Sequence, residues 1–565
     1  MLLQFLDTLR AIKEEPRIYT CAKIKLFAKL HYRGTVCVLA PIIFIWLLTP
    51  FPPQPYQWTG YCIAIMAAYW VSECIPLALT SFFPIIIFPF AGVSSTGEVC
   101  RSYFNDTVLM FLGSLILAYS IEQCGLHKRL AYIAIRSFGY SHVNLLLAMC
   151  VVTTFVSMWI TNTAAATMMV PIIFAVLKVF EDQKLLKIYD TNSDGEKVAS
   201  DITTCYFCVA TYSATIGGIG TLVGTATNLV FKGLLSSTYP KAPELLSFLK
   251  FSAFGIPLMI ILDIFMMLYM LILYVGCCRP RSATAKKTKV SPEGMKAAQK
   301  AVNENYAKLG RLTCWEGMVI LLFGGAMLLF FFRSPQTFKG WGDLISDYFE
   351  LNDTKFVRDS ALAALVVFLM FLLPSNISIC KNFTAKFHED FPKRVRSVLD
   401  WNCLTAALPY SFVFLLGGGF ALSDAAKKTG LNEKIGESLQ SLKSLPNIWI
   451  LLFVIIFVVL ITNLGSNVAV CNVVTPICMT LAKEIGRNPL WYALASGLSS
   501  SFCFMLPVGT PGNLVVQSAA KIPTIKMVKA GLGPTFTTIL FTWLLLYFYA
   551  PVIWSDLATL PEWTS

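Results

Sequence analysis

Charged residues are scarce in this chain. Asp, Glu, Lys and Arg make up 14% of its 565 residues, whereas 56% are hydrophobic and the mean hydropathy is +0.65. Average soluble domains carry about 25% charged residues. The shortage therefore excludes an ordinary soluble globular protein, and the long apolar runs predict a polytopic membrane protein. The formal net charge of +13 does not indicate nucleic-acid binding, because the basic residues lie between the apolar runs.

Residues for metal or covalent chemistry are also sparse. Only four histidines occur (His31, His127, His142 and His388), and none has the spacing of a metal site. The 17 cysteines are scattered, and the Cys205-x-x-Cys208 pair lies in an apolar run without a second pair, so zinc or redox chemistry is not indicated. Hydrolase motifs such as GxSxG and HExxH are missing from the apolar runs. We therefore expect no enzyme activity and no cofactor.

The apolar runs are long enough to cross a bilayer, which takes about 17–25 residues. They lie near 34–51, 57–77, 79–97, 107–124, 202–235, 250–277, 313–333, 358–374, 408–426, 489–518 and 531–553. Two further runs, 143–180 and 447–483, are broken by polar residues. The predicted fold is all-α, with about eleven transmembrane helices and two re-entrant hairpins. The first run shows no cleavage site, so we expect it to be retained as an anchor.

Basic residues gather in the N-terminal leader, in the 278–312 loop and around 381–396, whereas acidic residues mark 341–359 and the C-terminus. The positive-inside rule then predicts a cytoplasmic N-terminus and, after an odd number of crossings, an extracellular C-terminus. The predicted parts are a cytoplasmic segment 1–33, a first half 34–277 containing hairpin 143–180, a cytoplasmic basic loop 278–312, a second repeat 313–553 containing hairpin 447–483, and an extracellular tail 554–565. Asn352, in an Asn-Asp-Thr sequence on the outer side, is the predicted glycosylation site.

The chain repeats itself. Thr161-Asn162-Thr163-Ala164 matches Ser466-Asn467-Val468-Ala469, 305 positions later, and the pairs Pro171 and Pro476, Gly113 and Gly418, and Gly125 and Gly430 share that spacing. "GTATNLV" (224–230) mirrors "GTPGNLV" (509–515) after a shortened loop. Two related halves with an odd number of crossings each would have opposite orientations, which is the inverted repeat of secondary transporters.

Polar residues interrupt the apolar runs at matching places in both halves. Each hairpin is predicted to turn at its Asn-centred motif, and the Gly-rich segments 213–228 and 499–513 are predicted to unwind their helices. Irregular backbone inside a membrane is tolerated only where it is buried in protein or lines a cavity. Four breaks that converge would direct helix N-termini at an anion and leave carbonyl oxygens for a cation. Helix-to-helix hydrogen bonding is the alternative role for such residues.

Neither hairpin carries a basic residue in its apolar part, because none occurs between Arg136 and Lys178 or between Lys443 and Lys483. A bound dianion would therefore need dipoles, hydroxyls and co-bound cations, since a bare buried charge is very costly. This favours coupling to Na⁺ or exchange of one anion for another. Glu73 and Asp263 are the acidic residues at or near spans, and we interpret Glu73 as a structural partner near a cytoplasmic end.

The motifs "SECIPLALTSFFPIIIFPFAG", "SMWITNTAAATMMVPI", "GTATNLVFKG", "FLLGGGFAL" and "FMLPVGTPGN" together make the chain resemble the divalent-anion/sodium symporter family. The resemblance is to its solute carrier 13 group of di- and tricarboxylate transporters, and above all to the insect members. It implies a plasma-membrane homodimer in which a transport part moves like an elevator against a scaffold part. It also implies a substrate held between two Ser-Asn-Thr motifs.

The resemblance carries over to particular residues. The substrate-binding set becomes Thr161, Asn162, Thr163, Gly224, Thr225, Ser466, Asn467, Val468, Thr510 and Pro511. The first Na⁺ site becomes Ser157, Thr161, Asn162 and Gly224, and the second becomes Thr462, Gly465, Asn467 and Gly509. The chain departs from the family pattern at Val468, which cannot donate a hydrogen bond, and at Thr227 and Gly512, where relatives often carry proline.

The predicted function is secondary transport of di- and tricarboxylates such as succinate and citrate. Na⁺-coupled symport and cation-independent exchange both stay open, because the family contains both. A sulfate carrier of the same fold is the nearest alternative, since a tetrahedral anion would use the same dipoles. An anion channel is the weaker alternative, because mirrored hairpins favour alternating access over a continuous pore.

Overall fold

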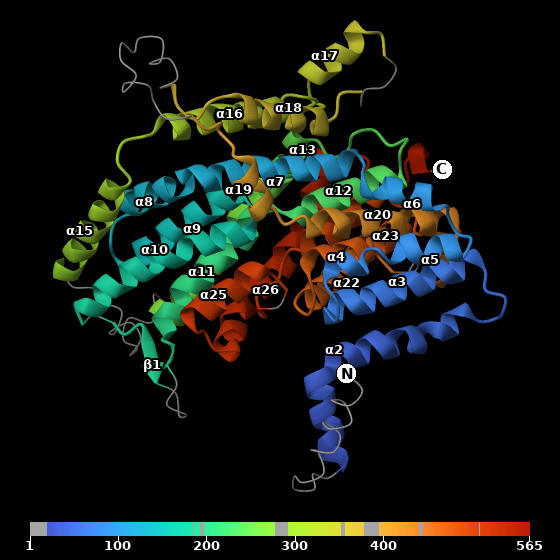
Figure 1. Ribbon diagram of the computed structural model, residues 1–565, viewed down its shortest axis with the longest axis horizontal. Helices are drawn as coiled ribbons and strands as arrows, with labels where there is room; N and C mark the ends of the chain where they lie inside the picture. Colours follow the sequence, from blue (N-terminus) through green and yellow to red (C-terminus); the bar gives the residue numbers. More distant parts are fainter. Residues whose placement is uncertain are drawn as a thin grey trace, which may run out of the picture.

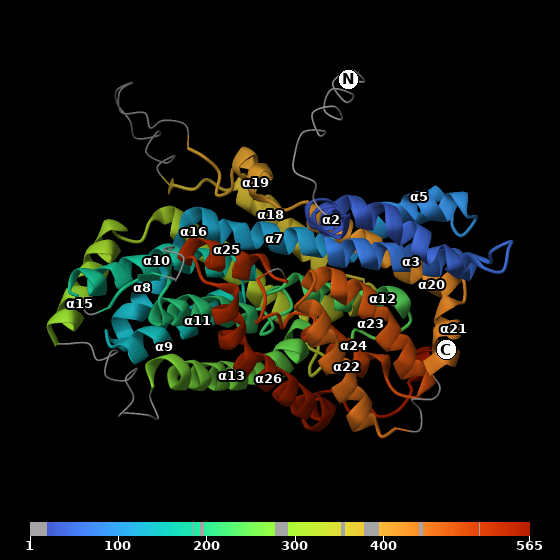
Figure 2. The ribbon, with the colours of Figure 1, turned by 90° about the horizontal axis from the view of Figure 1, so that it is seen from below.

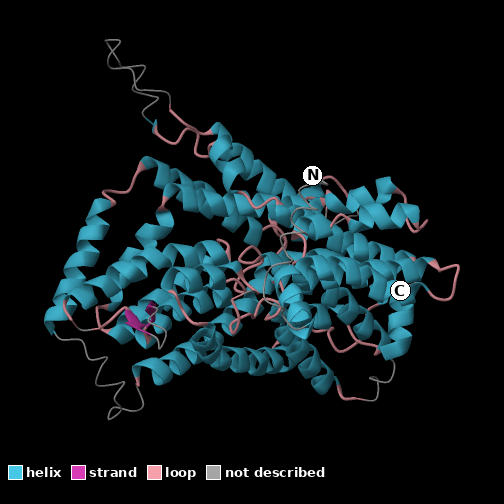
Figure 3. Cartoon of the chain, turned by 60° about the horizontal axis from the view of Figure 1, so that its bottom comes forward, coloured by secondary structure: helices cyan, strands magenta, loops and turns pink. Residues whose placement is uncertain are grey.

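The computed structural model describes residues 20–184, 186–191, 197–276, 292–351, 356–377, 395–439, 445–507 and 509–564. Helices dominate these residues. The described chain forms one small sheet, an antiparallel pair of β1 (Tyr189–Thr191) and β2 (Lys197–Ala199), near one end of the molecule (Figure 3). The predominance of helices confirms the predicted class, a mostly α-helical polytopic membrane protein. Asn352, the predicted glycosylation site, lies outside the described residues.

Both predicted hairpins are interrupted at their polar motifs. The first consists of α9 (His142–Ser157) and α10 (Asn162–Asp182), and the second of α22 (Asn447–Thr462) and α23 (Asn467–Glu484). The two hairpins lie in opposite halves of the molecule (Figures 1 and 2). At the first turn, the Thr161 hydroxyl accepts a hydrogen bond from Ala164 N (3.3 Å). This N-cap satisfies a free N–H of α10 and fixes where the helix begins.

The Gly-rich segments unwind as predicted. α11 (Asp201–Gly217) and α12 (Ala226–Thr238) are separated by the first break, and α24 (Pro489–Ser499) and α25 (Pro511–Ala520) by the second. After each break the chain crosses to the other half of the molecule. α12 of the first half packs against α23 of the second hairpin, and α25 of the second half packs against α10 of the first (Figure 1). This crossing brings the breaks and the hairpin tips together.

The remaining long helices of the described residues surround these elements. They include α2 (Thr20–Phe44), α3 (Pro55–Ser72), α7 (Asp106–Cys124), α8 (Leu126–Phe138), α13 (Phe248–Met270), α16 (Cys314–Phe331), α18 (Asp359–Leu372), α20 (Ser411–Lys428) and α26 (Thr524–Phe548). Six helical stretches of the described chain are long and apolar enough to cross a membrane. The other predicted crossings fall in shorter or bent helices, such as α19 (Trp401–Ala407) and α20, which meet at 58°. The count of eleven crossings stays a prediction.

Two predicted segments differ in the structure. The 79–97 run is not one helix but α4 (Leu77–Thr80), α5 (Phe83–Phe90) and the start of α6 (Thr96–Tyr103), because Pro84 lies in the first turn of α5 and Gly92 (φ 69°) follows its end. The predicted basic loop 278–312 contains α15 (Pro292–Lys308), an amphipathic helix that buries Gly294, Ala298 and Val302 on one face. That face packs against α8 and α10.

Two glycines at the repeat spacing share one backbone conformation. Gly125 ends α7 with φ of 78°, and Gly430 ends the helical stretch of α20 with φ of 73° before α21 (Leu431–Leu439). A left-handed residue at a helix C-terminus strongly favours glycine. The two halves therefore use the same turn, 305 residues apart, to connect corresponding helices.

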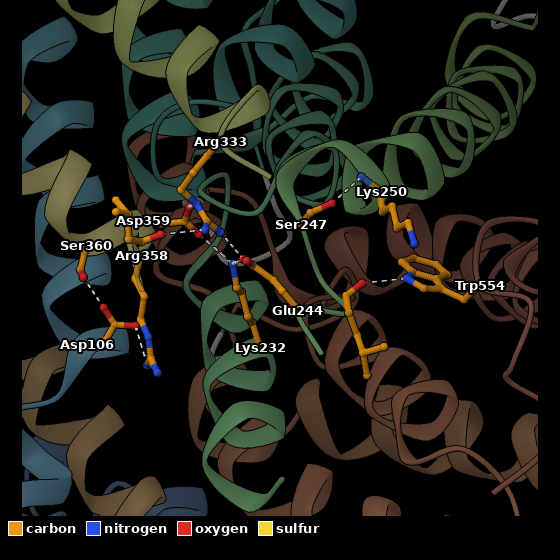
Figure 4. Close-up of polar contacts among 12 residues, drawn as sticks. Asp106, Lys232, Glu244, Ser247, Lys250, Arg333, Arg358, Asp359, Ser360 and Trp554 are labelled. Carbon is orange, nitrogen blue, oxygen red and sulfur yellow. Dashed lines mark hydrogen bonds and ion pairs between the residues drawn. The ribbon is translucent and has the colours of Figure 1, made fainter. Parts of the chain in front are cut away.

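A buried ion-pair network, which the sequence analysis did not predict, joins four segments (Figure 4). Asp359 at the start of α18 binds Lys232 Nζ of α12 (2.9 Å) and Arg333 Nε after α16 (2.5 Å). Glu244, before α13, pairs with the same two basic side chains. The four side chains are at most 17% exposed. Removing one member would leave a buried charge unpaired, so the network holds these segments together as a unit.

Candidate functional site

A cavity of about 520 Å³ lies where the hairpin tips and the two breaks meet. All predicted substrate-binding residues line it: Thr161, Asn162, Thr163, Gly224, Thr225, Ser466, Asn467, Val468, Thr510 and Pro511. Other wall residues come from α7, from Glu73 at the end of α3, from Leu77 at the start of α4, and from 407–412, which runs from the end of α19 into the start of α20. The structure therefore brings together residues that lie more than 300 positions apart in the chain.

The predicted Na⁺ ligands divide into three groups. Thr161, Asn162, Gly224, Asn467 and Gly509 line the cavity. Ser157 and Thr462 are fully buried and lie directly behind the two asparagines. Gly465 is at the turn of the second hairpin, where the position of its missing Cβ faces Val71 of α3, and it is not part of the cavity wall.

In the first half, Ser157 connects the hairpin to the break. Its hydroxyl lies 2.6 Å from Ala214 O and 3.0 Å from Asn162 Oδ1. None of the described residues is a hydrogen-bond partner for Asn162 Nδ2, and Asn162 lines the cavity. The amide of Asn162 is thus anchored at one end, and its nitrogen can donate to an anion in the cavity.

The second half brings the corresponding side chains together, but its amide has the opposite orientation. Thr462 Oγ1 donates its single proton to Ser500 O (2.5 Å) and lies 2.8 Å from the Asn467 amide. The Asn467 amide therefore turns its nitrogen toward Thr462 Oγ1 and Gly509 O (3.0 Å), with its oxygen accepting from Thr510 Oγ1 (3.2 Å). Asn467 thereby fastens the hairpin tip to both sides of the second break.

Two further asparagines, which the sequence analysis quoted only as part of the repeat, hold the breaks in shape. Asn228 Nδ2 donates to Gly218 O (3.0 Å) and Thr221 O (2.8 Å). Asn513 Nδ2 donates to Cys503 O (2.9 Å) and Leu506 O (3.4 Å) at the matching positions of the other half. The carbonyl groups freed by unwinding thus receive side-chain donors, as buried backbone requires. The repeated Asn in "GTATNLV" and "GTPGNLV" was the available signal.

Side-chain hydrogen bonds also connect the region of each break to the other half of the chain. Thr227 Oγ1, in the first turn of α12 after the first break, lies 2.5 Å from Ser501 Oγ of the second break. Thr211 Oγ1 of α11 donates to Asn513 Oδ1 (2.7 Å). Thr227, one of the departures from the family pattern, therefore supplies a cross-link between the halves where a proline could donate none.

Four helix N-termini face the cavity. α10 begins at Asn162, α12 at Ala226, α23 at Asn467 and α25 at Pro511, and each of these residues lines the wall. The first N–H groups of a helix lack partners within the helix, and the helix dipole adds partial positive charge there. The arrangement offers an anion site made of backbone.

The charged side chains on the described part of the wall are both acidic. They are Glu73 and Glu122, and no Lys, Arg or His is among the described lining residues. Glu73, interpreted from the sequence as a structural partner, caps α3 in a left-handed conformation (φ 47°) and forms no ion pair with a described residue. Glu122 of α7 was overlooked, although it is an acidic residue inside an apolar run. This wall would repel a bare dianion and attract cations.

Broken helices whose tips meet around a cavity, in a chain of long apolar helices, define a membrane carrier. Solved structures share the fold at low identity. The YdaH transporter of Alcanivorax borkumensis matches with a TM-score of 0.51 and 13% identity over 90% of this chain and 100% of its own. The Neisseria gonorrhoeae MtrF pump matches with a TM-score of 0.52 and 12% identity over 90% and 98%.

The chain belongs to the family of the sodium:sulfate symporter transmembrane region, whose model matches residues 29–557. Its relatives include the Drosophila melanogaster "Protein I'm not dead yet", 34% identical over 96% of this chain and 92% of that protein. The rat Na(+)/citrate cotransporter is 32% identical over 90% and 93%. The Caenorhabditis elegans sodium-dependent high-affinity dicarboxylate transporter 3 is 34% identical over 90% and 85%. The family resemblance predicted from the motifs is confirmed.

Proposed function

We propose that this protein is a secondary transporter of di- and tricarboxylates, such as succinate and citrate, and that it moves them together with Na⁺. The observation that carries the proposal is the cavity itself. It combines four helix N-termini and two Asn-centred tips with an absence of basic side chains on its described wall. The names of the relatives, which include Na(+)/citrate and dicarboxylate cotransporters, support this substrate class.

The charge of the site supports Na⁺ coupling. A dicarboxylate in this cavity would meet Glu73 and Glu122 without a fixed countercharge from the described wall. Burying a bare anion is very expensive, and each helix N-terminus contributes only about half an elementary charge. Co-bound cations would remove most of this cost. Exchange of one anion for another is the competing coupling mode, and ion replacement separates the two.

In this proposal the two hairpin tips hold the two ends of the substrate. Asn162 would donate to one end through its amide nitrogen, together with the hydroxyls of Thr161 and Thr163. Ser466 and the first N–H groups of α23 would donate to the other end, while Asn467 and Thr510, which are bonded to each other, would keep that tip in shape. One Na⁺ would bind between Ser157, Thr161, Asn162 and Gly224, and a second near Thr462, Asn467 and Gly509, with Gly465 at its outer edge. Val468 would contact the substrate without a hydrogen bond, so the carboxylate at the second hairpin tip would be bound more weakly than the carboxylate at the first.

The larger-scale features belong to the same proposal. Movement of the hairpins and breaks against the surrounding helices would carry the substrate across by an elevator motion. We further propose a homodimer in the plasma membrane, with the N-terminus cytoplasmic and the C-terminus extracellular. Charge distribution along the sequence and membership of the family support these features.

The test is uptake of labelled citrate and succinate into proteoliposomes that contain the purified protein. We expect uptake that is lost when external Na⁺ is replaced by choline and that unlabelled citrate suppresses more strongly than sulfate. Unchanged uptake in choline would contradict Na⁺ coupling and support exchange. Stronger competition by sulfate would refute the carboxylate assignment. Asn162→Ala and Asn467→Ala should each abolish uptake while the protein still elutes as a single folded species.

A further inference from the structure

Asp263 is a half-buried acidic residue in the middle of the apolar helix α13, away from the cavity described above, and its carboxylate Oδ1 is covered by protein. Its Oδ2 accepts a hydrogen bond from Thr154 Oγ1 of α9 (2.6 Å). The Cys150 thiol, one helical turn earlier on α9, lies beside the same carboxylate. An acidic residue at such a position is costly and calls for a specific partner.

Two oxygen atoms in this cluster, Asp263 Oδ1 and Ser213 Oγ, have no nitrogen or oxygen hydrogen-bond partner among the described residues, and their neighbour is the Cys150 thiol, which is only a weak donor. Ser213 belongs to α11 and is fully buried, and its carbonyl oxygen lies 3.4 Å from Thr154 Oγ1. The Cys150 thiol lies beside Ser213 as well as beside Asp263. Helices α9, α11 and α13 pack on one another here (Figure 2). Oxygen atoms from three helices therefore surround one buried point.

The carboxylate has no fixed countercharge. None of the described Lys, Arg or His residues forms an ion pair with Asp263, and the titratable group that reaches it from the packed helices is the Cys150 thiol. An uncompensated carboxylate inside protein is strongly disfavoured, so the site is expected to hold a cation. Carboxylate, hydroxyl and carbonyl oxygens are the donors that hard cations prefer.

The second repeat does not share this cluster. At the spacing of 305 residues, Cys150 corresponds to Ile455 and Thr154 to Val459, both fully buried and apolar. A role in holding helices together that both halves require would be expected in both halves. The polar cluster is therefore expected to serve a function that is specific to the first half.

The cluster lies next to the first predicted Na⁺ site. Thr154 precedes Ser157 by one helical turn of α9, and Ser213 directly precedes Ala214, whose carbonyl oxygen binds Ser157 (2.6 Å). A cation held at Asp263 would fix the same two helices that position Ser157 and Asn162. Binding at one place would thus favour binding at the other, because the ordering of shared helices is required only once.

We propose that Asp263, Thr154 and Ser213 form a third cation site, which binds one monovalent cation, Na⁺ or a proton. The proposal rests on the proposed function of cation-coupled transport and adds a positive charge that moves with the substrate. It assigns the unpartnered oxygens as cation ligands, and it gives the first half a coupling element that the second half lacks.

Ser213→Ala provides the sharpest test. If Ser213 were only structural, removing a buried hydroxyl without a partner would be neutral or stabilising. As a cation ligand, its removal should instead weaken cation binding by roughly tenfold, the effect of losing about 1.4 kcal/mol. Ser252→Ala is the matched control, because Ser252 is a buried serine of α13 whose hydroxyl also lacks a partner among the described residues.

The first measurement is thermal unfolding of the purified protein, without carboxylate, over a titration of Na⁺ against choline at several pH values. We expect Ser213→Ala and Asp263→Asn to shift the Na⁺ midpoint at constant pH if the site takes Na⁺. A loss of pH dependence at constant Na⁺ would identify a proton instead. Asp263→Glu, which keeps the charge, serves if Asp263→Asn does not fold. Wild-type behaviour of both Ser213→Ala and the foldable Asp263 variant would overturn the proposal.

The second measurement is charge moved per citrate in voltage-clamped proteoliposomes, where Asp263→Asn should carry one positive charge fewer. An unchanged charge ratio together with an altered citrate KM would refute the third site and leave only a structural effect. A different result is expected if the proposed transport function is wrong but the cation site exists. The wild-type protein would transport no carboxylate, and Ser213→Ala would still change the dependence of thermal unfolding on the cation.

Discussion

Gly224 is where the requirement for a broken helix can be tested most directly. A Cβ at this position would lie 2.5 Å from Gly218 O and 3.1 Å from the Cα and carbonyl carbon of Gly218. All three are backbone atoms of the same break, so they cannot move aside as a flexible side chain would. The Gly218 carbonyl also accepts the hydrogen bond from Asn228 (3.0 Å). The added methyl group of Gly224→Ala is therefore expected to displace the backbone of the break.

The expected cost is the sum of two effects. Overpacking in a filled interior costs about 1–3 kcal/mol. Loss of the Asn228 hydrogen bond adds about 0.5–1.5 kcal/mol. If this destabilises the binding-competent break, affinity for substrate and Na⁺ falls by between roughly tenfold and a thousandfold, since about 1.4 kcal/mol corresponds to a factor of ten.

The assay is concentration-dependent citrate uptake into proteoliposomes, with protein quantity and folding checked by size-exclusion chromatography. Gly317→Ala in α16 is the matched control, because no atom lies within 4 Å of its added Cβ. That variant should transport like the wild type, because alanine favours a helix over glycine. Wild-type KM for citrate and for Na⁺ in Gly224→Ala would refute the idea that the geometry of this break forms the site.

Three other predictions concern the same molecule. Asp359→Asn should lower the unfolding temperature markedly, because breaking a buried ion pair costs about 3–5 kcal/mol. The control Asp347→Asn, whose partner Lys339 is largely exposed, should change the free energy of unfolding by at most about 1 kcal/mol. Equal unfolding temperatures of the two variants would exclude a stabilising network. Val468→Thr should tighten dicarboxylate binding about fivefold through one added hydrogen bond of about 1 kcal/mol, measured as a lower KM for succinate; an unchanged KM would place the second carboxylate elsewhere. Thr227→Val removes the 2.5 Å bond to Ser501 and should slow citrate uptake severalfold, whereas full activity would show that the halves need no link there.

The candidate site was predictable because its parts are local. Each hairpin tip is a short polar motif inside an apolar run, and each break is a Gly-rich segment, so the sequence marks where helices must stop. The spacing of 305 residues then identifies Asn162 and Asn467 as counterparts, and matching left-handed glycines at Gly125 and Gly430 show the same repeat in the backbone.

Tertiary structure decided what those parts touch. Only the folded chain pairs Lys232 with Asp359, turns Glu122 toward the cavity, directs Asn228 and Asn513 at unwound carbonyls, and sets Thr154 against Asp263. Long apolar runs and the polar or Gly-rich residues that interrupt them determine that helices form and where they end, because those properties depend on neighbours within a few residues. Which polar groups meet across helices depends on packing between distant segments, and a membrane-spanning sequence of similar apolar runs does not specify it.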